Sequence, residues 1–315
     1  MKSYALLLVP LLWACGDDTS TVTPDASTSN DASAVPDGDA AITPPPDASE
    51  AGPKPDGGKT SGCGVLGKPT GDFHRTTKDG NGASRDYEVI VPASYDPNTP
   101  VALTFGFHGA GGNEAAAKGY DLQGSAGAAS IFAFPQGVPF KTFGVGWDDS
   151  CGGYDMKLFD AMVAELSADY CIDPKRIFAA GFSWGCDFVT ALACCRGDRV
   201  RAIGAASCTD EFTNANDAKT YTNLPCPVKV GTAVRFTHDA SGGDSGYPAP
   251  LFATTSALYR SFDACASTSK PVSPSPCVAY DGCASPLIEC AYPNLGHSTP
   301  AGWGAATWSF FSTFK

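Results

Sequence analysis

Hydrophobic residues follow two patterns along the chain: short apolar or alternating runs, and longer stretches with apolar residues at three- and four-residue spacing. The runs predict β-strands, which we place at 85–92, 101–107, 130–134, 177–180, 202–206, 228–236 and 287–292. The spaced pattern predicts helices, which we place at 155–171, directly after residue 185, at 253–262 and at 305–314. Strands alternating with helices favour an α/β fold with a mostly parallel sheet and helices on both faces.

Residues 16–60 follow neither pattern. They consist almost entirely of Pro, Asp, Ser, Thr, Ala and Gly. Because this composition cannot bury enough apolar surface to offset the entropy lost on folding, we expect a disordered linker, extended by its prolines. The folded domain is therefore expected at 61–315.

The first fifteen residues have the pattern of an export signal. Lys2 precedes an apolar run at 5–14 that is too short to span a bilayer. The run ends in Leu12-Trp13-Ala14-Cys15, which resembles a bacterial lipobox with Cys15 as the lipidated residue. We therefore expect an extracytoplasmic protein, either a cell-surface or outer-membrane lipoprotein held to the membrane through Cys15 or a secreted protein.

Composition restricts the function. The chain has 315 residues, is 43% hydrophobic and carries a formal net charge of −12, with nine acidic residues in the linker alone. This is long enough for one large α/β domain. The acidic balance argues against binding to nucleic acid, which needs clustered Lys and Arg.

The chain has 13 cysteines, and setting Cys15 aside leaves an even number. An even, dense set in an exported chain predicts disulfides. Their connectivity is open, although the adjacent Cys194 and Cys195 cannot easily bond to each other. Because Cys-x₂-Cys pairs are absent and there are only four histidines, we expect no metal site.

The segment Gly181-Phe182-Ser183-Trp184-Gly185 lies between a predicted strand and a predicted helix. This G-x-S-x-G context is typical of the nucleophile elbow of α/β-hydrolases, with Ser183 as the nucleophile. A serine nucleophile needs a histidine base and an acid, in the chain order Ser, Asp or Glu, His. Of the two histidines that follow Ser183, His297 lies in a polar loop between the last strand and the last helix, and is the predicted base.

The acid is expected after the penultimate strand. Asp239 directly follows that strand and is the predicted acid, while Asp244 in the same glycine-rich loop is the alternative. His238 is expected to point away from Asp239 and to be structural or to line the pocket.

An oxyanion hole needs two backbone N–H donors. Trp184 is expected to supply one. The loop His108-Gly109-Ala110-Gly111-Gly112 should supply the other, from Ala110 or alternatively Gly109. His108 is expected to fix this loop and to lie at the substrate pocket. Trp147 is expected either to form the bottom of the pocket or to belong to the core.

Together, the elbow, the His108-Gly109 loop, Cys171, Cys277-x₅-Cys283, Cys290 and the Gly296-His297 pair resemble secreted feruloyl esterases, which are grouped with polyhydroxybutyrate-depolymerase-like and acetylxylan esterases. Cys186 differs, since it stands where that family usually has a further glycine. The resemblance covers about 61–315 and implies an α/β-hydrolase fold, serine esterase chemistry without a cofactor, and Ser183, Asp239 and His297 in the places of the triad.

The predicted activity is hydrolysis of feruloyl or acetyl esters on plant cell-wall polysaccharide by a monomeric enzyme. Three alternatives remain open from the sequence: a polyhydroxybutyrate depolymerase, an acetylxylan or general short-chain esterase, and a surface binding lipoprotein without catalysis.

Overall fold

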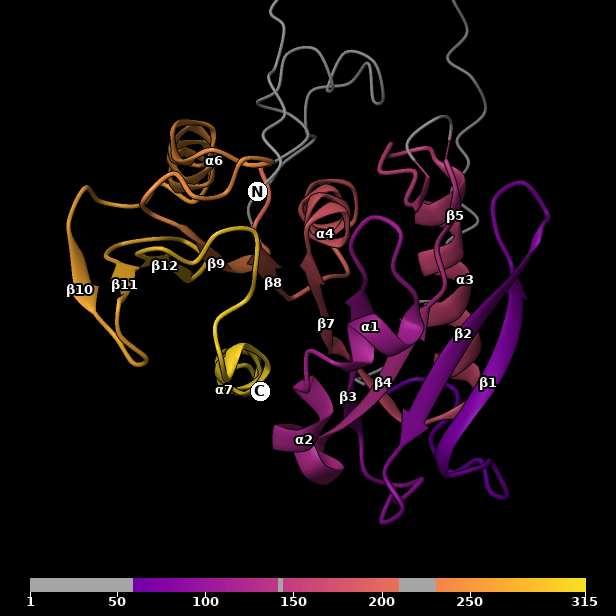
Figure 1. Ribbon diagram of the computed structural model, residues 1–315. Helices are drawn as coiled ribbons and strands as arrows, with labels where there is room; N and C mark the ends of the chain where they lie inside the picture. The colour runs from indigo at the N-terminus through magenta and orange to yellow at the C-terminus, as the bar shows by residue number, and fades with distance from the viewer. Residues whose placement is uncertain (1–58, 141–143, 210–230) are drawn as a thin grey trace, which may run out of the picture. The chain divides into compact units, whose positions relative to one another are not determined.

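The computed structural model describes residues 59–140, 144–209 and 231–315 (Figure 1). All of them belong to one compact unit, Ala51–Lys315. The predicted signal peptide, Cys15 and the predicted linker up to residue 58 lie outside the described residues, so those assignments remain predictions. No helix in the described ranges is long and apolar enough to cross a membrane.

Ten strands of the described residues form one sheet, in the order β1-β2-β4-β3-β7-β8-β9-β12-β11-β10 (Figure 1). The six central strands, from β4 to β12, run parallel to one another, and antiparallel strands flank them on both sides. The strands are β1 (Gly71–Lys78), β2 (Ser84–Val91), β3 (Val101–Phe107), β4 (Ser130–Pro135), β7 (Ile172–Phe182), β8 (Ala202–Ala206), β9 (Ala233–Asp239), β10 (Ser269–Pro271), β11 (Cys277–Tyr280) and β12 (Leu287–Tyr292). A separate small hairpin pairs β5 (Val138–Pro139) with β6 (Val145–Gly146).

Helices cover both faces of the sheet and make two apolar cores. One core contains residues of α3 (Tyr154–Asp169), α4 (Trp184–Cys195) and α6 (Ala249–Phe262). The other contains residues of α1 (Glu114–Lys118), α2 (Leu122–Ala126) and α7 (Trp303–Phe311), and a 3₁₀ turn at Gly127–Ala129 follows α2. The central strand β3 is buried along its whole length because it is covered on both faces. The predicted α/β-hydrolase fold is therefore confirmed.

Most predicted strands and helices lie where the sequence placed them. The main differences are at their ends and at the sheet edges. The elbow strand begins at Ile172, because residues 172–176 also have an extended backbone, and β9 extends to Asp239 instead of ending at residue 236. The edge strands β1 and β10 were not predicted, because they are largely polar and exposed and lack a clear apolar run. The neighbouring strand β11 was not predicted either, because it has only four residues.

The disulfides predicted from the cysteine count are present. Five join described cysteines: Cys63–Cys171, Cys151–Cys195, Cys186–Cys208, Cys265–Cys283 and Cys277–Cys290. Cys194 is also disulfide-bonded, and its neighbour Cys195 pairs with Cys151, so the two adjacent cysteines have separate partners. Cys63–Cys171 fixes the start of the domain to the start of β7 across 108 residues of sequence.

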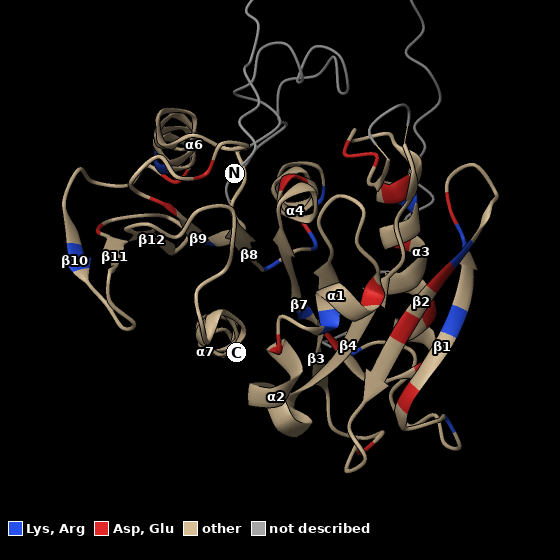
Figure 2. Ribbon diagram, in the orientation of Figure 1, with Lys and Arg blue, Asp and Glu red and all other residues tan. Residues whose placement is uncertain are grey.

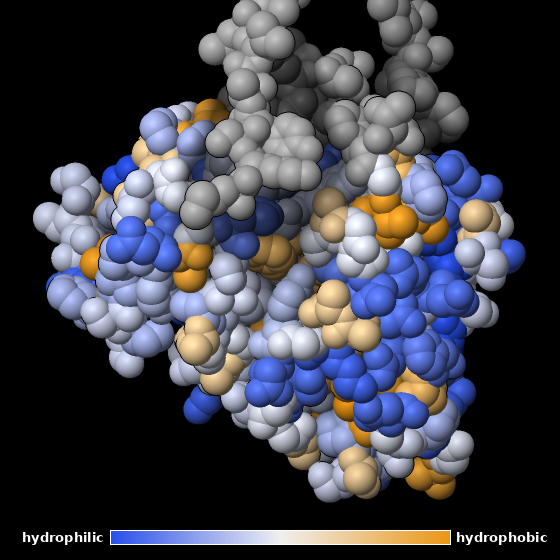
Figure 3. Space-filling model, in the orientation of Figure 1, coloured by the Kyte–Doolittle hydropathy of each residue, from blue (hydrophilic) through white to orange (hydrophobic). Residues whose placement is uncertain are grey.

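Charged and apolar surface are distributed unevenly. Acidic and basic residues are frequent on β1, β2 and α3 (Figure 2). The face in Figure 3 is largely hydrophilic over β1 and β2, and its apolar residues lie in separate small patches. Among the described residues, only Leu66 and Leu251 are large exposed hydrophobics.

A buried ionic cluster joins the β1–β2 hairpin to α3. Arg85 is 2% exposed, and its guanidinium lies 3.2 Å from the Asp79 carboxylate and 2.6 Å from the Asp155 carboxylate. It also donates to the backbone carbonyl of Gln136 at 2.9 Å. Two buried carboxylates and one loop therefore depend on one cation.

Replacement of Arg85 by Met should leave both carboxylates buried without their partner. We expect the free energy of unfolding to fall by about 3–5 kcal/mol, measured by urea denaturation of the oxidised protein. Arg199→Ala is the matched control: Arg199 is exposed and lies 3.3 Å from Asp160, so its loss should cost under about 1 kcal/mol. Equal losses in the two variants would show that the buried cluster contributes little.

Candidate active site

Ser183 lies at the turn between β7 and α4, with φ of 56°. This positive φ is strained for a serine, and the surrounding packing must hold it. A Cβ on Gly181 would collide with the backbone of Gly185, and a Cβ on Gly185 would collide with the backbone carbonyl of Phe107 in β3. The Ser183 amide donates to the carbonyl of Ala206 in β8 at 3.0 Å. The two glycines therefore let the turn fit between two neighbouring strands.

His297 comes from the loop between β12 and α7 and reaches the serine directly. Its Nε2 lies 2.9 Å from Ser183 Oγ, and its Nδ1 lies 3.1 Å from the Asp244 carboxylate. Ser183 can donate to Nε2 only when that nitrogen carries no proton, so the matching tautomer donates its Nδ1–H to Asp244. The structure thus brings the predicted nucleophile and the predicted base together.

The acid beside His297 is Asp244, not the predicted Asp239. Asp244 is 2% exposed, and its second oxygen accepts hydrogen bonds from the Gly246 and Tyr247 amides at 3.1 and 3.0 Å. These bonds fix the carboxylate in the orientation that reaches the imidazole. Asp244 was the alternative from the sequence.

Asp239 is the last residue of β9, and its carboxylate bonds backbone amides instead of a ring. It accepts from the amides of Ser241, Gly243 and Gly296. These amides hold its pKa below the ordinary aspartate value, with Gly296 the largest cause. The carboxylate that contacts His297 is therefore that of Asp244, the alternative acid, and not that of Asp239. The sequence could not separate the two, because both follow the same strand.

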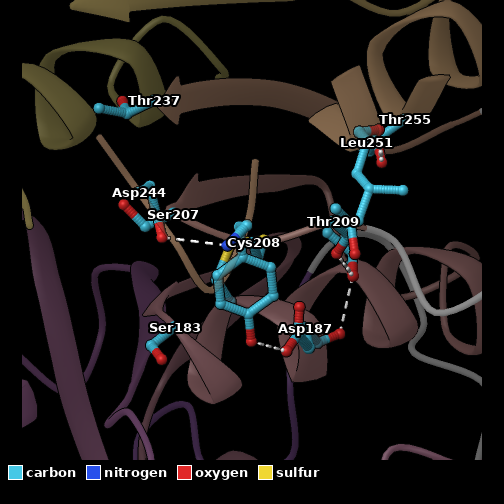
Figure 4. The surroundings of a disulfide bond; sticks show 12 residues. Ser183, Asp187, Ser207, Cys208, Thr209, Thr237, Asp244, Leu251 and Thr255 are labelled. Carbon is cyan, nitrogen blue, oxygen red and sulfur yellow. Dashed lines mark hydrogen bonds between the residues drawn. A yellow bond between two sulfur atoms is a disulfide. The ribbon is translucent and has the colours of Figure 1, made fainter. Parts of the chain in front are cut away.

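Two aromatic rings enclose the imidazole of His297. Phe182 lies with its ring centroid 4.7 Å away, and Tyr247 stacks at 5.6 Å with an interplanar angle of 24°. The Tyr247 hydroxyl donates to Asp187 on α4, and Figure 4 shows Asp187 one helical turn beyond Ser183. Neither Tyr247 nor Asp187 was predicted, since nothing in the sequence pattern links them to the site.

Cys186 forms its disulfide with Cys208, just beyond the end of β8, and Figure 4 shows Cys208 among Ser183, Asp187 and Asp244. Both cysteines are buried. Next to Cys208, Ser207 donates through its hydroxyl to the carbonyl of Ser298, the residue after the base. Cys186 therefore connects helix α4 to the end of β8, and Ser207 at that strand end bonds the loop that carries His297.

The glycine-rich loop lies against the nucleophile. A Cβ added at Gly109 would stand 3.0 Å from the Ser183 Cβ. The Gly111 amide donates to Val145 in β6 at 2.8 Å, which holds the loop in place. The predicted oxyanion donors, Ala110 and Trp184, follow Gly109 and Ser183 directly and thus belong to the two segments that meet here.

His108 and Trp147 lie behind this loop. Both are 0% exposed, so neither side chain lines an open pocket. Trp147 belongs to the core, which was one of its two predicted places. His108 Nε2 accepts from the Gly137 amide at 2.9 Å, and Nδ1 lies 2.8 Å from the Gly109 carbonyl. Burial lowers the pKa of His108, which favours the neutral ring that these bonds require. Trp147 donates to the His108 carbonyl at 2.8 Å, so both residues brace the loop from the core.

A serine, a histidine and an aspartate that meet at the carboxyl ends of a mostly parallel sheet define a serine hydrolase of the α/β-hydrolase fold. Protein-family models give no match to the chain. It is 31% identical over 280 residues to the probable feruloyl esterase C of Aspergillus clavatus, and the aligned region covers 80% of this chain and 90% of that protein. It is 30% identical over 280 residues to the feruloyl esterase C of Emericella nidulans, and this alignment covers 81% of the chain and 92% of that protein. The chain therefore belongs to the feruloyl esterase C family and is a carboxylic ester hydrolase.

Solved structures share the fold at lower identity. An acetyl xylan esterase from Aspergillus awamori superimposes with a TM-score of 0.58 at 15% identity, covering 76% of this chain and 99% of that chain. A ferulic acid esterase from Anaeromyces mucronatus, solved with ferulic acid, gives a TM-score of 0.51 at 16% identity, covering 83% and 94%. These similarities support the α/β-hydrolase fold.

Asp244→Asn should leave the loop in place but favour the wrong tautomer of His297, because the amide can donate to Nδ1. We expect kcat to fall roughly 10⁴-fold, as for the equivalent change in a Ser-His-Asp site. The measurement is steady-state hydrolysis of p-nitrophenyl acetate, with circular dichroism as the control for folding. A kcat within tenfold of wild type would mean that Asp244 is not the acid.

Proposed function

We propose that Ser183, His297 and Asp244 act as nucleophile, general base and orienting acid in ester hydrolysis through an acyl-enzyme. The observation that carries this proposal is that one imidazole lies 2.9 Å from the serine hydroxyl and 3.1 Å from a buried carboxylate. A base must lie within hydrogen-bond distance of the proton that it takes, and His297 meets this requirement.

In the proposed mechanism, Ser183 Oγ attacks the ester carbonyl while its proton passes to His297 Nε2. Asp244 stabilises the resulting imidazolium through Nδ1–H. The amides of Trp184 and Ala110 would hold the oxyanion. The imidazolium then gives its proton to the leaving alkoxide, which departs as the alcohol. Water, deprotonated by His297, attacks the acyl-enzyme and releases the acid.

For the substrate, we propose feruloyl esters on plant cell-wall polysaccharide. The names of the two relatives support an aromatic acyl group. The partly buried rings of Phe182, Trp184 and Tyr247 lie close to Ser183 in sequence or in space, and aromatic side chains suit contact with a planar acyl group.

We further propose that the protein is exported and held to a membrane by a lipid on Cys15, with residues 16–60 as the tether and the domain as a monomer. The disulfides support an oxidising, extracytoplasmic location. A tethered enzyme of this kind would suit an insoluble substrate at the cell surface.

The test compares methyl ferulate with p-nitrophenyl acetate, using the full oxidised chain and Ser183→Ala. We expect turnover of methyl ferulate, and we expect Ser183→Ala to lower kcat by roughly 10⁶-fold, because the nucleophile is lost.

Other outcomes would redirect the assignment. Serine-dependent turnover of the acetate alone would favour an acetylxylan or short-chain esterase. Failure with both, but clearing of polyhydroxybutyrate films, would favour a depolymerase. No serine-dependent turnover of any of the three would overturn the proposed reaction and leave a binding protein.

A further inference from the structure

Asp239 lies between the two loops that carry the acid and the base. It ends β9, where it pairs in register with Tyr292 at the end of the parallel neighbour β12. The loop with Asp244 leaves β9 at this point, and the loop with His297 leaves β12. The Asp239 side chain is 2% exposed, so a carboxylate is buried at the junction of the two loops.

The carboxylate bonds both loops at once. Oδ1 accepts from the Ser241 and Gly243 amides at 2.7 and 3.0 Å, on the side of the acid loop. Oδ2 accepts from the Gly296 amide at 2.6 Å, on the side of the base loop. Gly296 directly precedes His297, so this bond acts on the backbone next to the base.

The backbone of both loops is shaped around this acceptor. Gly242, Asn294 and Gly296 have φ of 77°, 56° and 64°, and such left-handed turns aim consecutive N–H groups at one anion. The Asn294 amide also donates to the Ser241 hydroxyl at 3.1 Å, a second bond between the loops. Since the bonded amides favour the ionised form, Asp239 keeps its negative charge at neutral pH.

The neighbouring titratable groups contact other atoms. His238 Nδ1 lies 3.1 Å from the Asp239 backbone carbonyl, and its Nε2 lies 3.3 Å from Glu289 on β12. Asp244 bonds His297. The hydrogen bonds seen for the Asp239 carboxylate in the described ranges are thus to backbone amides.

We propose that Asp239 is a positioning residue that clamps the base loop to the acid loop, and so holds His297 between Ser183 and Asp244. This inference rests on the proposed reaction at Ser183. The imidazole must keep two hydrogen bonds, to residues on different loops, and a misplacement of about 1 Å can cost roughly 10²-fold in rate. The clamp acts through the backbone, so it supplies geometry and not a proton acceptor.

Asp239→Asn tests the clamp with little change in shape. The amide nitrogen would replace one acceptor oxygen and face an N–H donor, so one of the two loops must move. We expect kcat to fall roughly 10²-fold with KM within about twofold of wild type. Because the clamp positions the base for the transition state and not for the binding of substrate, the loss should fall on kcat and leave KM almost unchanged.

The controls separate this role from others. Asp281→Asn removes an aspartate that bonds Lys270 and Thr268 away from the loops, and it should change neither kcat nor KM. A loss in Asp239→Asn as large as 10⁴-fold, with Asp244→Asn near wild type, would make Asp239 the acid and overturn the clamp. An Asp239→Asn enzyme with wild-type kcat would also overturn the clamp. An active Ser183→Ala would instead refute the proposed reaction.

A measurement on the wild-type protein covers the case in which Asp239→Asn does not fold. Amide resonances of Gly243 and Gly296 should shift together as pH falls, with one midpoint below the ordinary aspartate pKa, because one carboxylate accepts from both. The contribution of the ionised Asp239 to folding stability should be fully present above the ordinary aspartate pKa. It should be lost as the pH falls through the lowered pKa of Asp239 in the folded protein. Separate transitions, or none, for the two amides would contradict the clamp.

Discussion

The backbone of Ser183 imposes the main constraint on this structure. A serine with φ of 56° keeps that conformation only where the surrounding packing enforces it. Here β7 runs between β3 and β8 at the centre of the sheet, and two glycines let the turn approach both neighbours without a steric clash. The reactive hydroxyl is thereby presented at the carboxyl end of the sheet, where the loops of the parallel strands meet.

Two buried aspartates, one at the end of β9 and one in the loop that follows it, make different kinds of contact. Asp244 directs one oxygen at an imidazole, and Asp239 directs both oxygens at backbone amides. In our proposal, the first fixes the tautomer of His297, and the second controls where the backbone places that residue. A carboxylate that accepts several amide hydrogen bonds stays ionised at low cost, which makes it suitable for joining two loops in a buried place.

Behind the glycine-rich loop, the core supplies a second layer of support. Arg85 bonds the carbonyl of Gln136, and the next amide, Gly137, bonds His108. His108 in turn contacts Gly109, which lies against Ser183. Because these polar groups are buried, each lost bond would leave an unsatisfied partner. Folding stability and active-site geometry therefore depend on some of the same residues.

The sequence by itself determined the fold class, the central strands and the positions of Ser183 and His297, because apolar periodicity and chain order are local properties. It could not choose between Asp239 and Asp244, which follow the same strand five residues apart. That choice depends on how the loop turns at Gly242 and on which side β12 brings His297. The pairing of the cysteines, the edge strands β1 and β10 and the short strand β11 were likewise decided only in the tertiary structure. They depend on contacts between residues far apart in sequence, which hydrophobic patterns do not record.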